Sequence, residues 1–250
     1  MTAEQASPMS VRRMLWRTLL LFVILHIAAI AGILLTLAPA VTAGDPQAVT
    51  VLPWLIGLFA GVVAFTLLRD QKRLTPSLII VAVAAEGLFL GGIATYFEGR
   101  MPGVVLQVAF AALSVVVAFL PLAATVQIRR LRRGARTLLF VAGGYAVFML
   151  HNLTLMEMDF IPEQTAWGQG ATSVLGAPLG LILAALIVPS LAYTLARTVE
   201  HTEAAANERA PAHHAWQAGL NVMALILWHI VETPRSLVLA HNAAEEASGK

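Results

Sequence analysis

The sequence predicts an all-α, polytopic membrane protein, a bundle of seven transmembrane helices with its N-terminus inside and its C-terminus outside. Of its 250 residues, 58% are hydrophobic and only 12% are charged, whereas a soluble domain carries about 25% charged residues. Seven apolar runs approach or exceed the length of about 20 residues that a helix needs to cross the hydrocarbon layer. Basic residues are almost confined to alternate connections between these runs.

The seven predicted spans follow one another within a single domain. They cover 14–37, 51–68, 77–97, 104–126, 137–156, 173–196 and 215–240. Helix breakers and charges separate them, at Ala38-Pro39, Asp45-Pro46, Arg69-Asp70, Pro102-Gly103, Arg129 to Arg136, Pro162 and Pro211. Because lipid offers the backbone no hydrogen-bond partner, each run is expected to be helical. Residues 14–240 therefore form one transmembrane domain, with a cytoplasmic tail at 1–13 and a C-terminal tail at 241–250.

The distribution of basic residues predicts the orientation. The N-terminus and the connections at 69–76, 127–136 and 197–214 carry thirteen of them: Arg12, Arg13, Arg17, Arg69, Lys72, Arg73, Arg129, Arg130, Arg132, Arg133, Arg136, Arg197 and Arg209. The opposite side carries only Arg100 and Lys250. Loops rich in Lys and Arg stay in the cytoplasm. This rule accounts for the cluster from Arg129 to Arg136, which could alternatively bind acidic lipid or nucleic acid.

The first span could instead be a signal peptide, because Arg12 and Arg13 precede it and Ala38-Pro39-Ala40 resembles a cleavage site. Its apolar stretch is longer than the usual signal core of roughly 7–15 residues. A retained helix is therefore expected. The excess of arginine over lysine, 14 to 2, favours a bacterial cytoplasmic membrane as the location of this multi-pass protein.

Catalytic motifs are missing from the sequence. There is no cysteine, which excludes disulfides, thiolate nucleophiles and Cys-ligated metal sites. The sequence also contains no Walker loop, GxSxG or HExxH motif, and the last span has no lysine that could hold a retinal-type Schiff base. We expect a protein that is not an enzyme, carries no cofactor and binds no nucleic acid.

Glu86 lies near the middle of the third span, where a charge costs roughly 2.5–3.5 kcal/mol on insertion scales. Gly87 and Gly91 are four residues apart and permit close helix approach beside the carboxylate. Glu86 is predicted to be an ion or proton site inside the bundle. The alternative is a protonated, hydrogen-bonded packing residue.

The last span carries a stripe of ionisable residues, His229, Glu232 and Arg235, each three residues from the next. Pro234 is expected to kink the helix nearby, so that the stripe could form a gate. Helix rise places Glu86 and Glu232 at comparable depths, where two facing carboxylates would share one proton. The alternative is a Glu232–Arg235 pair that only neutralises itself.

Histidines offer two weaker sites. His26, His151 and His229 lie on three spans, and two imidazoles could ligate a haem, although no spacing supports this. His201, His213 and His214, near Glu200 and Glu203, could bind metal, but a solvated loop is the simpler interpretation.

Two segments of the sequence have a distinctive pattern. One is EGLFLGGIATYFE from Glu86 to Glu98, continued by MPGVVLQ from Met101 to Gln107. The other contains Trp216 and the run from Trp228 to Glu232 and Arg235. The first resembles the EGLFLG segment, short external turn and following glutamine of the Bax inhibitor-1/YccA family, in its actinobacterial type, and the second is similar to that family's last helix.

The resemblance implies a central helix wrapped by six others and a pH-sensitive calcium leak. In characterised members, two carboxylates on the last two helices share a proton and control opening. Glu232 matches the second of these. The first is an Asp in the family, where this chain has Thr198-Val199-Glu200. Glu200 could replace it, but sequence places it at the inner interface, about one turn too far away. The arginine found in the second helix of some members is absent, because 51–68 carries no charge.

The expected function is therefore a passive, proton-modulated cation leak for calcium, with Glu232 as gate, Glu86 as intramembrane partner and Arg235 as charge modulator. Glu232 and Glu200 are the candidate calcium ligands. The alternative is a regulatory membrane protein that binds a membrane-anchored quality-control protease, as the YccA branch implies. The other expected partners are the lipid bilayer and calcium or protons.

Overall fold

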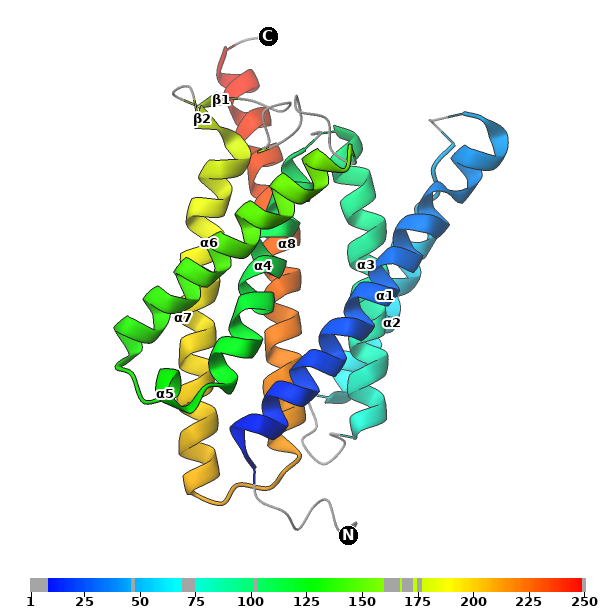
Figure 1. Cartoon of the computed structure of the whole chain (residues 1–250). Helices are drawn as coiled ribbons and strands as arrows, with labels where there is room; N and C mark the ends of the chain where they lie inside the picture. The colour runs from blue at the N-terminus through cyan, green and yellow to red at the C-terminus, as the bar shows by residue number, and fades with distance from the viewer. Residues whose placement is uncertain are drawn as a thin grey trace.

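In a computed structural model, the chain is described over residues 9–45, 48–68, 75–100, 103–159, 167, 173–174 and 177–248. Within these residues, long helices dominate (Figure 1). They are α1 (Val11–Ala43), α2 (Leu52–Leu68), α3 (Pro76–Arg100), α4 (Val104–Ala124), α6 (Arg133–Glu157), α7 (Leu179–Asn207) and α8 (His214–Ser248). A four-residue helix, α5 (Val126–Arg129), follows α4, and strands β1 (Ser173–Val174) and β2 (Ala177–Pro178) form an antiparallel pair.

Five of the described helices are long and apolar enough to cross a membrane: α1, α3, α4, α6 and α7. Helix α2 is apolar but has only 17 residues, and α8 carries more polar side chains along its length. Large apolar side chains such as Ile27, Leu34, Phe59 and Val63 are more than half exposed. Soluble monomers rarely expose contiguous apolar surface of this kind, so the outer faces of α1 and α2 are suited to lipid.

Each predicted span contains a helix, but several boundaries were wrong. The first helix does not stop at Ala38-Pro39: Pro39 lies inside α1, which continues to Ala43. A proline inside a helix loses one backbone hydrogen bond and crowds the carbonyl four residues earlier, but here the helix continues for one more turn. It ends at Gly44, whose left-handed φ of 66° closes the last turn through a bond from its N–H to the Ala40 carbonyl.

The second error concerns 173–196, predicted as helical throughout. Residues 173–174 and 177–178 pair as β1 and β2, and α7 begins at Leu179. At its other end α7 continues through Glu200 and His201 to Asn207, so most of the predicted inner connection at 197–214 is helical. This extension contains Ala204, Ala205 and Ala206, good helix formers that need no lipid around them.

Helix α8 runs from His214 to Ser248 as one element. It passes both Pro234, where a kink was expected, and residue 240, where the transmembrane domain was expected to end. Pro162 and the first eight residues of the N-terminal tail lie outside the described residues.

Helix α3 packs between α1 and α2 through glycines (Figure 1). A Cβ atom added to Gly91 would lie 2.0 Å from the Ala29 carbonyl oxygen of α1, and one added to Gly87 would lie 2.4 Å from the Leu25 carbonyl oxygen. On the other side, a Cβ at Gly57 of α2 would lie 2.4 Å from the Phe89 nitrogen. Close approach at Gly87 and Gly91, expected from their spacing, is therefore confirmed.

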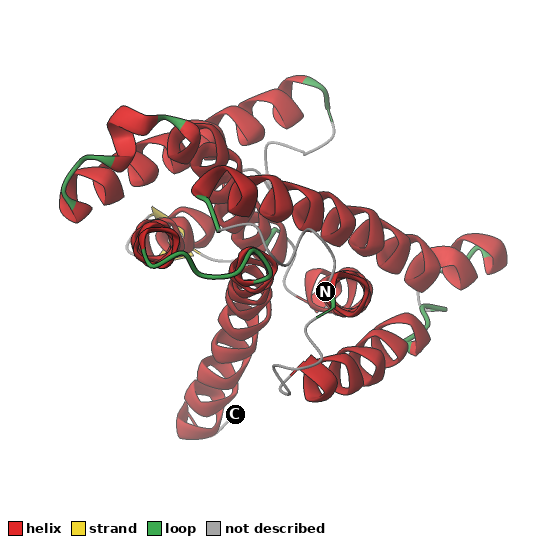
Figure 2. Cartoon of the chain, turned by 90° about the horizontal axis from the view of Figure 1, so that it is seen from below, coloured by secondary structure: helices red, strands yellow, loops and turns green. Residues whose placement is uncertain are grey.

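Helix α4 is the most buried of the five candidate membrane spans among the described residues. It packs against α6, α7 and α8 and, less extensively, against α1 and α3, whereas α2 packs chiefly on α3. Buried residues along α4 include Val108, Ala112, Val115 and Phe119. The arrangement implied by the resemblance, one central helix wrapped by six others, is thus found only in part. Figure 2 shows from below that the helices cross at an incline.

Candidate functional site

Glu86 is the one carboxylate among the described residues that is fully enclosed by the bundle. Its exposed fraction is 2%, and neither carboxylate oxygen has a hydrogen-bond partner in the part of the chain that the structure describes. It lies ten residues into α3, which corresponds to about 15 Å from the start of the helix. This placement is near the middle of the 25-residue helix.

A cavity of about 340 Å³ lies beside Glu86, between α2, α3 and α8. Helix α2 contributes most of its lining, α3 contributes Glu86 and Phe89, and α8 contributes Leu227. Among the described residues, Glu86 is the only ionisable side chain in this lining. A buried polar group without a partner is costly, so this carboxylate is not explained by packing.

The alternative interpretation, in which Glu86 is a hydrogen-bonded packing residue, is therefore not supported by any hydrogen bond among the described residues. Thr66 also lines the cavity, but its hydroxyl donates to the Val62 carbonyl of its own helix at 2.7 Å. The Glu86 position can exchange a proton or meet a cation without first breaking an ion pair.

Glu232 has a different environment. Its Oε2 accepts from Nε of Arg235 at 2.9 Å, one turn along α8, and its Oε1 accepts from the Ser236 hydroxyl at 3.3 Å. The Glu232 side chain is 29% exposed and that of Arg235 is 54% exposed. Glu232 and Arg235 therefore form an ion pair within α8, which is the alternative that the sequence offered to a gate at this position.

Glu232 and His229 line a second cavity, of about 310 Å³, with Trp228 and with Leu183 of α7. The His229 ring is held by the Leu225 carbonyl at 2.8 Å and by the Ser190 hydroxyl of α7 at 3.3 Å. Glu86 lines none of this cavity. The structure therefore places Glu86 and Glu232 on separate cavities.

Glu200 is bound by two arginines of α6. Its Oε2 accepts from Nε of Arg133 at 2.7 Å, and its Oε1 accepts from a terminal nitrogen of Arg136 at 2.7 Å. Arg136 is 1% exposed and also donates to the Ala196 and Arg129 carbonyls. This ion-pair cluster fastens the extended end of α7 to the start of α6.

Glu200 and Glu232 are not brought together. Glu200 lies seven residues before the end of α7, and Glu232 lies 18 residues after the start of α8. The two helices run antiparallel through a short connection, so this difference of 11 residues separates the two carboxylates by about 16 Å along the helix axis. They cannot share a proton or a calcium ion in this arrangement.

The histidines are dispersed. His26 donates through Nδ1 to the Phe22 carbonyl oxygen at 2.7 Å, and Nδ1 of His151 forms a hydrogen bond with the Ser114 hydroxyl at 2.9 Å. His213 and His214 are neighbours in the inner connection, with ring centroids 4.4 Å apart, whereas His201 lies on α7. Within the described residues, no group of three or more His, Asp or Glu side chains could hold a metal ion.

Two polar contacts were not predicted. The fully buried Gln107 of α4 donates to the Asn152 side-chain oxygen of α6 at 2.7 Å. Glu98 accepts from the backbone nitrogen of Leu106 at 3.0 Å and from that of Gly103, thereby capping α4. Isolated polar residues in apolar runs were the signal for Gln107 and Asn152. Gly103 has a left-handed φ of 83°, which explains the glycine in this turn.

The helices, their lipid-compatible outer faces and the polar groups inside define an integral, multi-pass membrane protein. A family model described as Bax inhibitor 1 like matches residues 1–240. The chain therefore belongs to this family, as the two sequence segments indicated. No curated protein matches the chain, and no solved structure matches it.

Proposed function

We propose that this protein is a passive, proton-modulated cation leak that conducts calcium. The observation that carries the proposal is Glu86, a carboxylate without a partner that is buried beside a cavity between α2, α3 and α8. Ionisable residues inside membrane segments typically mark ion paths or proton relays. Membership of the Bax inhibitor 1 like family supports this function by resemblance.

Glu86 is the proposed site at which a proton and a cation compete. When Glu86 is ionised, its charge can attract a cation into the cavity; when it is protonated, that attraction is lost. Within the described residues, no other ionisable side chain lines the cavity, so the proposed exchange depends on this one group. The proposal moves the gating role from Glu232, the residue expected from sequence, to Glu86.

Glu232 and Arg235 take a secondary role in the proposal. Their ion pair lies five residues or more beyond Leu227, the α8 residue at the Glu86 cavity. A salt bridge at this position would modulate the local potential along the path without holding the ion itself. His229, hydrogen-bonded to Ser190 across to α7, would couple the two helices there.

We further propose that all seven long helices cross the membrane, with the basic ends of α1, α6 and α7 in the cytoplasm. The N-terminus and C-terminus lie at opposite ends of the bundle (Figure 1), which suits an odd number of crossings. Helix α2, at 17 residues, is about 25 Å long and can span by local thinning of the bilayer. A bacterial cytoplasmic membrane remains the expected location.

The test is calcium entry into dye-loaded liposomes that carry the purified protein, measured between pH 5 and 8. Wild-type protein is expected to leak with a rate that changes over this range. Glu86→Gln is expected to abolish the pH dependence, because it keeps the shape of the side chain but cannot ionise. Glu232→Gln is expected to alter the rate less than Glu86→Gln does, and Glu208→Gln, at an exposed position on the inner connection, serves as the charge-matched control.

Two results would overturn the proposal. A wild-type protein that leaks no more than empty liposomes at every pH would exclude the channel activity. A leak whose pH dependence survives in Glu86→Gln would exclude Glu86 as the titrating site, and loss of the pH dependence in Glu232→Gln alone would return the gate to Glu232.

A further inference from the structure

A third, larger cavity lies at the end of the molecule where α1 begins, and Glu86 does not line it. It has a volume of about 560 Å³ and is bounded by α1 on one side and by α4 and α5 on the other. Binding pockets for small molecules typically measure about 300–1,000 Å³. The cavity is therefore large enough to take a substantial part of an amphipathic ligand.

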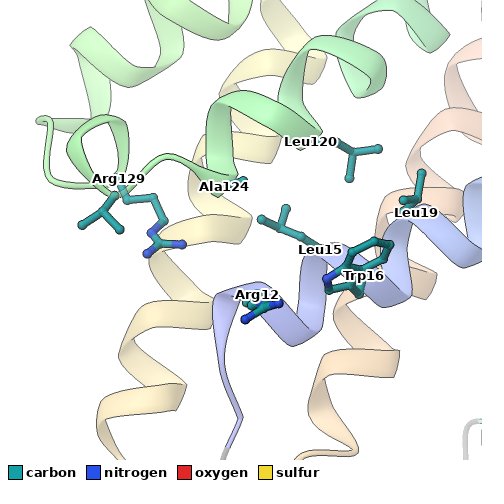
Figure 3. A pocket seen from close by; sticks show the side chains of 8 residues that line it. Arg12, Leu15, Trp16, Leu19, Leu120, Ala124 and Arg129 are labelled. Atoms are coloured by element: carbon teal, nitrogen blue, oxygen red, sulfur yellow. The ribbon is translucent and has the colours of Figure 1, made fainter.

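One wall is a regular stripe of α1. Arg12, Leu15, Trp16 and Leu19 occupy positions i, i+3, i+4 and i+7, so they lie on one face of the helix. Leu120 and Ala124 of α4 face them, and Figure 3 shows the apolar side chains between the two ribbons. Trp16 is 62% exposed at the rim, the position that tryptophan favours at a membrane interface.

Two arginines complete the cavity at its basic end. Arg12 comes from the first turn of α1 and Arg129 from α5, and both line the cavity (Figure 3). Within the described residues, Arg12 makes no ion pair or hydrogen bond through its side chain. Arg129 lies 3.4 Å from Glu203 through its Nε, and Glu203 lines a neighbouring hollow instead of this one.

The surroundings of Arg12 are positive as well. Arg12 also lines an adjoining hollow of about 430 Å³ together with Ser10, Arg13, Trp16 and Arg17. The start of α1, where the Ser10 hydroxyl accepts from the Arg13 backbone nitrogen, adds a partial positive charge through the helix dipole. Glu203 offsets part of this field, because it pairs with Arg129 and lines one further hollow together with both Arg12 and Arg129.

We propose that this cavity binds an anionic phospholipid from the leaflet at the basic end of the protein. The phosphate lies between Arg12 and Arg129, and an acyl chain lies along Leu15, Leu19 and Leu120. An apolar wall that ends in two cations is complementary to a lipid with a negative headgroup, and basic pockets between membrane helices on the cytoplasmic side recognise such headgroups. A soluble anion would use the arginines but leave the apolar wall empty.

The experiment compares the retention of phosphatidylglycerol and phosphatidylcholine on the full-length protein, by native mass spectrometry from a neutral detergent. The wild type is expected to retain phosphatidylglycerol more tightly. Arg12→Gln is expected to weaken that retention about fivefold, which corresponds to about 1 kcal/mol per basic residue near an anionic surface. The matched control is Arg130→Gln, which removes the same charge from an exposed arginine outside the cavity.

The apolar wall is tested separately. Leu19→Trp fills the cavity and is expected to reduce retention of phosphatidylglycerol, whereas Leu20→Trp, on the exposed side of the same turn, is expected to leave it unchanged. Equal retention of the two lipids by the wild type would overturn the proposal. So would equal losses in Arg12→Gln and Arg130→Gln, or competition by inorganic phosphate alone, which would assign the cavity to a soluble anion.

Discussion

Two groups of helices pack through different kinds of contact: the first group is α1 to α3, and the second is α4, α6 and α7. In the first group, glycines of α2 and α3 bring backbones into contact, and the buried carboxylate of Glu86 has no partner. In the second group, polar side chains meet across helices, in Gln107–Asn152, Ser114–His151 and Arg136–Glu200.

The difference separates structural polar groups from a candidate functional one. Polar contacts between membrane helices contribute to stability when both partners are present. Each pair in the second group has both partners, although Gln107 Oε1 and Arg136 Nε make no hydrogen bond within the described residues. Glu86 contributes no such contact, so its carboxylate is expected to lower stability in exchange for function. The predictions below test whether the two groups differ in this way.

The largest effect is expected at the glycine contacts. Gly91→Ala would place a methyl group 2.0 Å from the Ala29 carbonyl oxygen, where backbone and not a flexible side chain must move. We expect a loss of about 3 kcal/mol in the free energy of unfolding, at the upper end for an overpacked site. Denaturation of the protein in detergent measures this loss.

Gly61→Ala is the matched control, because no atom lies within 4 Å of the added Cβ. Higher helix propensity is expected to make this variant up to about 1 kcal/mol more stable than the wild type. Similar stabilities of the two variants would show that α1 and α3 are not held at close distance by glycine.

The next effect is expected at Arg136. Arg136→Met removes the donor to Glu200 and to two backbone carbonyls from a buried site. Breaking a buried ion pair costs about 3–5 kcal/mol, but Glu200 is partly exposed and keeps Arg133, so we expect about 2–3 kcal/mol. The control is Arg133→Met, at the more exposed arginine, for which little change in stability is expected. Thermal denaturation measures the stability of both variants. Equal losses would mean that Arg136 is not the anchor of the cluster.

A smaller effect, of opposite sign, is expected at Glu86. Glu86→Met removes a buried carboxylate that has no hydrogen bond, and an unsatisfied buried group costs about 1–3 kcal/mol. We expect the variant to be about 1 kcal/mol more stable than the wild type and to lose the pH-dependent leak. Chemical denaturation and liposome flux measure the two properties on one preparation.

Glu200→Gln provides the contrast, because this change weakens two ion pairs and is expected to lower stability. Destabilisation by Glu86→Met as well would indicate that Glu86 has a structural partner and would remove the distinction between the two groups of helices.

Much of the fold follows from local sequence, because hydrophobic length and the breakers between runs identify helices directly. Gly87 and Gly91 also predicted their contact correctly, since spacing on one helix is a local property. The predicted helix boundaries were wrong where two local sequence rules conflict. Pro39 was expected to end a helix and did not, and the alanines after Glu200 extended α7 beyond its apolar run.

The site was less accessible from sequence, because partners come from other helices. Glu86 could be singled out by its cost in the bilayer, but its lack of partners depends on how α2 and α8 pack around it. Glu200 looked like a replacement for a gating carboxylate, yet Arg133 and Arg136 of α6 bind it. Both arginines lie more than 60 positions before Glu200 in the sequence, so no local pattern could predict that they bind it.

The smallest effect concerns His213, which lies between α7 and α8 outside both groups of helices. Burial, together with the positive charges of His214 and Arg17, lowers the pKa of the His213 imidazole below its ordinary value. Between the two pKa values the unfolded chain binds a proton that the folded protein does not, so stability falls as the pH drops below about 6.5. Because the side chain is partly exposed, we expect a contribution below about 2 °C in Tm.

The measurement is the change in Tm between pH 7.5 and pH 5 for the wild type and for His213→Gln. Other groups titrate in this range, so only the difference between the two proteins reports on His213, and the wild type is expected to lose more. His201→Gln is the control, because this histidine is exposed on α7. If His213→Gln loses as much stability as the wild type, the charges of Arg17 and His214 do not reach His213, and the contact between α1 and the inner connection contributes nothing to the pH dependence of stability.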